Sequence, residues 1–227
     1  MTLGYKKQLF AILMICVSAI GFAQSGEIKI RFIGNCGLYM TDGASDIYID
    51  FPYKSGAHNY MEYDSVEIEN VKPNSTFIFT HKHADHYQEK LLKKMSGNKY
   101  GPWNVQDLEK LNQSIPDFRI EAFKTPHKVF GISFQHYSYL ITWHGKKIYI
   151  SGDTESSETI SKQSNLDWAF VPAWLIVDGM ERKVPLNTIS KMYAIYHIGP
   201  NDNITNDKAD PQIKLLDKQG DLITIPL

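Results

Sequence analysis

The sequence predicts a single α+β domain in which β-strands outnumber helices. Its 227 residues are 43% hydrophobic and 12% aromatic, so the chain can bury a sizeable core within one domain. Short runs rich in Ile, Phe, Tyr and Val are typical of strands and recur along the chain, whereas few stretches have the spacing of amphipathic helices. The sequence has no repeat of fixed period and no low-complexity tract, so nothing in it indicates a second structural unit.

The first strand is expected at residues 28–33, where apolar and polar residues largely alternate before a turn at Gly34, Asn35 and Gly37. Further strands are expected at residues 46–51, 75–80, 118–123, 132–143, 146–151, 168–172 and 192–197. The dipeptide His144-Gly145 predicts a hairpin turn. Helical spacing is found at residues 88–94, 105–112 and 155–163, and the polar stretch 200–210 resembles a linker.

Residues 1–23 are expected to be a secretory signal peptide. Lys6 and Lys7 precede an apolar run at residues 9–20, and the small-residue stretch that ends at Ala23 follows it. The run is about a dozen residues long, shorter than the roughly 20 residues that span a bilayer. We therefore expect cleavage after Ala23, no stable membrane insertion afterwards, and a secreted or periplasmic protein whose folded domain comprises residues 24–227.

Cysteine content and net charge restrict the stabilising bonds and the partners. Cleavage would remove Cys16 and leave Cys36 as the sole cysteine, so the domain has no internal disulfide, and Cys36 is interpreted as a small buried hydrophobic residue. Lys and Arg number 24 against 25 Asp and Glu and are dispersed, which argues against nucleic acid as a partner. A small-molecule substrate is expected, and the oligomeric state stays open.

The residues that point most directly to chemistry follow the apolar segment 77–79. The sequence Thr80-His81-Lys82-His83-Ala84-Asp85-His86 places three imidazoles and a carboxylate within six residues. Side chains two apart on an extended chain point the same way, so His81 and His83 can converge on one ion while the following turn directs Asp85 and His86 to a neighbouring point. Imidazole nitrogen and carboxylate oxygen are ligands of zinc, and the scarcity of cysteine excludes a thiolate-rich structural site. The cluster predicts an open metal site of the catalytic kind.

The His-x-His-x-Asp-His motif at residues 81–86 resembles the hallmark of the metallo-β-lactamase superfamily. Later segments match the order of the family's remaining motifs: Thr125-Pro126-His127, Ser151-Gly152-Asp153-Thr154 and Tyr196-His197-Ile198-Gly199. The opening Ile33-Gly34-Asn35-Cys36-Gly37, followed by Ile49-Asp50, is similar to the small bacterial lactonase-like branch. The resemblance covers most of the chain after the signal peptide. It implies a four-layer αβ/βα sandwich, two β-sheets flanked by helices, with every ligand on a loop at one edge of the sheets.

The resemblance also implies the metal ligands. One zinc ion would be bound by His81, His83 and His127, a second by Asp85, His86 and His197, and Asp153 would bridge the two at a separation of roughly 3.5 to 4 Å. Manganese or iron could replace zinc, because nitrogen and oxygen ligands accept several divalent metals. A metal-bridging hydroxide is expected to cleave an ester, lactone or phosphodiester bond, with Asp85 orienting it and moving a proton.

Three alternative functions stay open. β-Lactam hydrolysis is disfavoured because the true lactamases of the superfamily usually have another residue at the position of Asp153. Iron-dependent oxidoreduction is disfavoured because the di-iron branch typically has Glu where this chain has His83, and because no flavin-binding domain is attached. A metal-binding protein without catalysis is compatible with the small size and short loops.

Residues outside the ligand set have competing interpretations. Asp50 follows a strand and is either a turn carboxylate or a partner that fixes a ligand imidazole. His58, His136 and His144 are interpreted as structural or solvated. His58 lies in loop 53–60, which could cover a substrate, as could Trp103 and Trp174, although packing is the favoured interpretation for the tryptophans.

Overall fold

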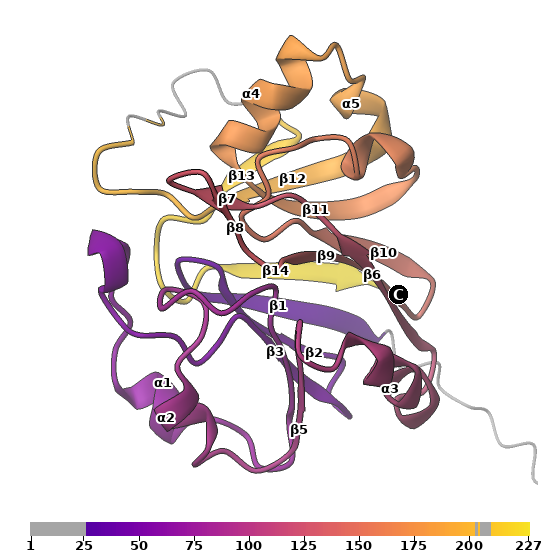
Figure 1. Cartoon of the computed structure of the whole chain (residues 1–227). Helices are drawn as coiled ribbons and strands as arrows, with labels where there is room; N and C mark the ends of the chain where they lie inside the picture. The colour runs from indigo at the N-terminus through magenta and orange to yellow at the C-terminus, as the bar shows by residue number, and fades with distance from the viewer. Residues whose placement is uncertain (1–25, 203, 205–209) are drawn as a thin grey trace, which may run out of the picture.

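The structure, a computed structural model, describes residues 26–202, 204 and 210–227. Within them, two six-stranded mixed sheets face each other and helices cover their outer faces, which gives four layers (Figure 1). This architecture confirms the expected αβ/βα sandwich. The expected signal peptide and its cleavage site lie outside the described residues. None of the described helices has the length and apolar character needed to cross a membrane.

The first sheet combines both ends of the described chain. Its strand order is β14-β1-β2-β3-β4-β5, with β14 antiparallel to β1 and with β3, β4 and β5 parallel. The strands are β1 (Glu27–Gly34), β2 (Gly37–Thr41), β3 (Asp46–Ile49), β4 (Thr76–Ile78), β5 (Asn98–Tyr100) and β14 (Leu222–Pro226). Short helices in its connections are η1 (Ala57–Asn59), α1 (Val66–Glu69), α2 (Glu89–Leu92), η2 (Val105–Asp107) and α3 (Leu108–Ser114).

The second sheet has the strand order β13-β12-β11-β10-β9-β6, in which β10 to β13 are parallel. Its strands are β6 (Phe118–Lys124), β9 (Tyr137–Trp143), β10 (Lys146–Ile150), β11 (Leu166–Pro172), β12 (Ser190–Tyr196) and β13 (Ile213–Leu215). A separate hairpin consists of β7 (Lys128–Val129) and β8 (Ile132–Ser133). The remaining helices are η3 (Ile160–Lys162), α4 (Ala173–Glu181) and α5 (Leu186–Ile189).

The alternation of residues in β1 shows why the sheets pack face to face. Ile28, Ile30 and Phe32 are buried in the core between the sheets, whereas Lys29 and Arg31 alternate with them on the other face. Each fully buried side chain of this size stabilises the fold by about 1.5 to 3 kcal/mol relative to exposure. Separate apolar clusters on the outer sheet faces bury residues of α2 and α4, so the helices are held by the same effect.

Two expected elements differ from the structure, and several of its elements, among them β5, β14 and α4, were not expected. The helix expected at residues 155–163 is reduced to the short η3, because the backbone N–H and the hydroxyl of Ser157 both donate to Asp178 Oδ2 and fix the preceding residues as turns. The strand expected at residues 132–143 is divided into β8 and β9, since His136 between them contacts the site. Helix α4 was not expected, because its apolar sequence directly continues that of β11.

Candidate metal centre

Loops at one edge of the sandwich carry the whole predicted ligand set. Residues 81–86 follow β4, His127 follows β6, Asp153 follows β10 and His197 follows β12. The carboxyl ends of the parallel strands β10 and β12 lie at the same edge, so residues far apart in the sequence meet there. The structure therefore brings all seven predicted residues into one buried cluster.

One part of the cluster is the three-histidine group, formed by His81, His83 and His127. One donor atom from each of them and one from Asp153 all lie within 4.8 Å of one another. His127 Nε2 is 3.2 Å from His83 Nδ1, and His81 Nε2 is 3.7 Å from Asp153 Oδ2. Donors at zinc-ligand distance from a tetrahedral ion lie about 3.3 Å apart, so this spacing fits a bound cation.

The other part is the buried group, formed by Cys36, His86 and His197. Their donor atoms and that of Asp153 also lie within 4.8 Å of one another. His86 Nε2 is 3.0 Å from Asp153 Oδ1, and His197 Nε2 is 3.1 Å from Asp153 Oδ2. Asp85 Oδ2 lies beside this group, 3.3 Å from His197 Nε2 and 3.6 Å from His86 Nε2. Asp153 is thus shared by both groups, in the position expected of a bridging ligand.

Unpaired imidazole nitrogens are the evidence that the cluster fits metal ions. The Nε2 atoms of His81, His86 and His197 are buried and have no hydrogen-bond partner within the described part of the chain. A buried polar atom without a partner costs about 1 to 3 kcal/mol, so several at one point require an explanation. A divalent cation between these nitrogens and the carboxylates would satisfy all of them, and the nitrogen and oxygen donors are those that zinc prefers.

The charges of the cluster favour a cation. Burial alone would lower the pKa of His86, but the carboxylates of Asp153 and Asp50 raise it well above its usual value. The pKa of His197 is raised to about 9 against the effect of burial, mainly by Asp153. Burial would raise the pKa of Asp153, yet the imidazoles of His197 and His86 hold it well below its usual value. A bound metal ion would take the place of these protons.

Hydrogen bonds behind the ligands fix the imidazole orientations. Asp50 Oδ2 lies 2.9 Å from His86 Nδ1 and also accepts from the hydroxyl of Thr80, so Asp50 contacts the imidazole of an expected ligand, as one of its two interpretations requires. Thr80 Oγ1 lies 3.0 Å from His81 Nδ1, and Glu155 Oε1 lies 3.0 Å from His127 Nδ1. With Nδ1 occupied in each ring, Nε2 is left to face the centre. Glu155 was not identified from the sequence, where it falls in an expected helix.

His136 supports the shared ligand from behind. Its ring is fully buried, Nε2 accepts a hydrogen bond of 2.9 Å from the backbone N–H of Asp153, and Nδ1 lies 2.7 Å from Thr125 Oγ1. Burial lowers the pKa of His136 to about 3, so the ring stays neutral. Gly152 has φ +59°, and a Cβ at this position would collide with His136 Nε2. The structural interpretation of His136 is confirmed. The same interpretation is confirmed for His144, whose Nε2 lies 2.9 Å from Asp42 Oδ2 away from the site.

Strained backbone places several residues of the site. Asn35, Asp50 and His197 have positive φ angles of 49°, 46° and 55°, a conformation that costs free energy outside glycine and is often found at functional sites. The carbonyl of Asn35 accepts a hydrogen bond of 3.1 Å from the N–H of His197, which joins the two sheets at this edge. Asn35 Nδ2 also donates to the carbonyl of Asp85 at 2.9 Å.

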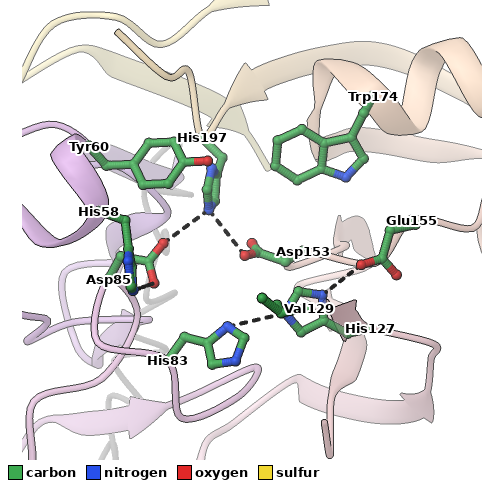
Figure 2. A pocket seen from close by; sticks show the side chains of 10 residues that line it. All are labelled: His58, Tyr60, His83, Asp85, His127, Val129, Asp153, Glu155, Trp174 and His197. Carbon is green, nitrogen blue, oxygen red and sulfur yellow. Dashed lines mark hydrogen bonds and ion pairs between the residues drawn. The ribbon is translucent and has the colours of Figure 1, made fainter. Parts of the chain in front are cut away.

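A cavity of about 480 Å³ opens onto the centre (Figure 2). Its described lining residues are His58, Tyr60, His83, Asp85, His127, Val129, Asp153, Glu155, Trp174 and His197. The rings of Tyr60 and Trp174 lie at centroid distances of 4.2 and 5.1 Å from His197. His58 is largely exposed, and its Nε2 is 3.9 Å from Asp85 Oδ1. Trp103 lines a neighbouring hollow, where Lys82 Nζ lies 4.9 Å from its ring.

The comparisons with known proteins concern the fold. No protein-family model and no curated protein matches the sequence. A proposed metal-dependent hydrolase from Parabacteroides distasonis aligns with a TM-score of 0.61 at 21% identity, over 84% of this chain and 92% of that protein. Igni18, a metallo hydrolase from Ignicoccus hospitalis, aligns with a TM-score of 0.59 at 15% identity. YhfI, a metallo-β-lactamase fold protein from Bacillus subtilis, aligns with a TM-score of 0.60 at 14% identity. Both alignments cover 88% of this chain and 99% of the other. The chain therefore has the metallo-β-lactamase fold.

Proposed function

We propose that the chain is an exported zinc-dependent hydrolase that cleaves ester or lactone bonds. The observation that carries this proposal is that buried imidazole nitrogens without a hydrogen-bond partner converge on one carboxylate, Asp153, at the edge of the sandwich where the cavity opens. Proteins of the same fold that are named metal-dependent hydrolases support it. The lactonase-like branch and the signal peptide are parts of the proposal.

Each part of the cluster has a proposed task. The three-histidine group would hold one ion, His86 and His197 would hold the second with Asp85 beside them on the cavity side, and Asp153 would contact both. When bound, such ions supply polarisation of the substrate oxygen and a lowered pKa for a water molecule. The protein supplies a fixed geometry, because Asp50, Thr80 and Glu155 prevent rotation of three ligand rings.

Asp85 is the residue that we propose orients the attacking water and accepts its proton. It lines the cavity, and the amide of Asn35 lies 3.4 Å from its Oδ2. Burial alone would raise the pKa of Asp85, but the imidazoles of His197 and His86 keep it below its ordinary value. The group is therefore an ionised carboxylate near neutral pH, which is the form that accepts a proton.

The cavity walls favour an ester or lactone over a phosphodiester. Val129, Tyr60 and Trp174 offer apolar and aromatic surface for the non-reacting part of a substrate, and the volume suits a small molecule. The carboxylate of Glu155 lines the same wall with 47% of its side chain exposed. An anionic phosphodiester would be repelled there, whereas a neutral carbonyl compound would not.

A substrate screen tests this function. The zinc-reconstituted chain is assayed with aryl esters, lactones, aryl phosphodiesters and nitrocefin, before and after chelation. We expect turnover of esters or lactones that chelation abolishes and zinc restores, and almost none in Asp85→Asn with its zinc retained. No turnover of any compound by the zinc-loaded chain would contradict the proposal. Faster turnover of phosphodiesters or nitrocefin would reassign the substrate class, and oxygen uptake by an iron-loaded chain would favour oxidoreduction.

The proposed export is tested separately. The amino-terminal sequence of the protein recovered from outside the cytoplasm is expected to begin at Gln24. A start at Met1 would contradict cleavage.

A further inference from the structure

The thiol of Cys36 lies in the centre rather than among hydrocarbon side chains alone. Its Sγ is 3.9 Å from Asp153 Oδ1 and within 4.8 Å of donor atoms of His86 and His197. Ligands at about 2.3 Å for sulfur and about 2.0 to 2.2 Å for oxygen around a tetrahedral zinc ion lie about 3.5 Å apart. The observed separation is close to that value, so the sulfur is within reach of an ion that Asp153 binds.

The turn that carries Cys36 is fixed to the other parts of the site. Asn35, the preceding residue, accepts a hydrogen bond from the backbone of His197 and donates two from its side chain to Asp85. At Gly34, with φ +147°, a Cβ would lie 2.6 Å from Tyr53 Oη, so the turn is also packed tightly from behind. The position of the sulfur is therefore set by the same contacts that set the positions of His197 and Asp85.

An independent observation indicates that this point holds a ligand. His86 and His197 are 0% and 3% exposed, and their Nε2 atoms have no hydrogen-bond partner in the described part of the chain. The His86 nitrogen and the Cys36 sulfur lie near Asp153 Oδ1, and the His197 nitrogen lies near Asp153 Oδ2. Two unpaired nitrogens, one carboxylate and one sulfur at mutual ligand spacing form a complete four-ligand set for zinc.

Building on the proposed function, we propose that Cys36 is a thiolate ligand of the buried ion, together with His86, His197 and Asp153. On binding, the thiol proton passes to solvent and the sulfur lone pair is donated to the ion. A thiolate is a soft ligand, so the buried group would select zinc, cobalt or cadmium over manganese. The three-histidine group, with only imidazole nitrogens and the oxygen of Asp153 as ligands, would discriminate less between these metals and manganese.

This assignment explains the position of Asp85. Asp85 lines the cavity beside the buried group, whereas Cys36 is fully buried on the side of the protein core. With the sulfur completing the ligand set from the core side, Asp85 stays on the substrate side. It is then available for the proton transfer proposed above.

Cobalt substitution tests the assignment without reference to activity. The full chain with Cys16→Ser, in which Cys36 is the sole thiol, is loaded with Co²⁺ and its absorption spectrum is recorded. We expect a near-ultraviolet sulfur-to-cobalt charge-transfer band, which is lost in Cys16→Ser/Cys36→Ser while the visible cobalt bands remain. A Cys16→Ser protein that binds two cobalt ions without this band would overturn the assignment, even if the Cys36 variants do not fold.

Metal selectivity gives a second readout. Zinc affinity is measured in competition with a chromophoric chelator. Loss of a hydrogen-bond partner behind a metal ligand lowers affinity by up to about 100-fold, and we expect Cys36→Ser to lower the zinc affinity of the buried group by more than this. Manganese affinity should change much less. Equal losses for both metals, or unchanged zinc affinity, would contradict a sulfur ligand. Failure of the proposed function is distinguishable, because a chain that hydrolyses no substrate can still show the sulfur-to-cobalt band.

Discussion

The two halves of the centre share Asp153 but differ in their surroundings. In the three-histidine group, His83 is half-buried at the cavity, and the Glu155 carboxylate behind His127 is 47% exposed. In the buried group, His86 is fully buried and its partner Asp50 is 0% exposed. A carboxylate acts more strongly on a cation where water is excluded. We therefore expect the buried half to retain a bound ion more tightly, and the cavity half to contact substrate and to exchange its ion more readily.

The largest effect is expected from the residue that both halves share. Asp153→Asn removes the negative charge that both groups share and replaces one of its two oxygens with an NH2 group, so one ion loses a ligand atom and both lose the carboxylate charge. We expect fewer than two zinc ions per chain and a fall in kcat of at least about a thousand-fold, which corresponds to about 4 kcal/mol of lost transition-state stabilisation. Elemental analysis and steady-state kinetics measure both. Asp117→Asn, an exposed position with positive φ, is the matched control. Retention of two tightly bound ions in Asp153→Asn would show that the halves are not joined by this residue.

The next effect separates the halves. Asp50→Asn weakens the orientation of His86 and should lower the zinc affinity of the buried group by about 10- to 100-fold. Glu155→Gln acts on the three-histidine group through an exposed carboxylate, so its effect should fall below about 10-fold. Sequential zinc titrations by calorimetry compare the two variants. A larger loss for Glu155→Gln would reverse the proposed difference.

Alanine substitutions at two glycines test how tightly His136 packs behind Asp153. Gly152 and Gly145 have φ angles of +59° and +76°, but an added Cβ meets His136 and Thr80 at Gly152 and nothing within 4 Å at Gly145. Both alanine variants carry backbone strain, so their difference isolates the collision. We expect Gly152→Ala to lower the free energy of unfolding by about 1 to 3 kcal/mol more than Gly145→Ala. Equal losses in urea denaturation would mean that His136 and Thr80 both move aside freely.

The last effect appears only as the pH decreases. His136 has a pKa of about 3 in the folded chain, whereas an unfolded histidine titrates near its ordinary value of 6.5. Below pH 6.5 the unfolded state therefore binds the proton first, and folding stability falls as pH decreases towards 3. His136→Gln should remove up to about 1.4 kcal/mol per pH unit of this decrease in the metal-free chain. Denaturation curves at pH 4 to 6.5 test it, and identical slopes for both proteins would contradict a neutral His136.

Local sequence predicted the first group of expected ligands and most strands, because both depend on neighbouring residues. The run from His81 to His86 and the alternation in β1 are of this kind. The late ligands His127, Asp153 and His197 were recognised by their order in a known family, and the structure places them together.

What the sequence did not predict depends on contacts between distant segments. Residues 155–163 have helical spacing, but the bonds from Ser157 to Asp178 fix a turn instead. Strand β14 is completed by pairing with β1 at the other end of the described chain. Cys36 was interpreted as a small hydrophobic residue, and it is buried, but its distance to Asp153 follows only from the way the two sheets meet.

Anomalous X-ray scattering at the zinc absorption edge, from crystals of the zinc-loaded chain, tests the central claim most directly. We expect two anomalous peaks, one among His81, His83 and His127 and one among Cys36, His86 and His197, with Asp153 between them. Peaks confined to the protein surface, or none within ligand distance of Asp153, would contradict the account.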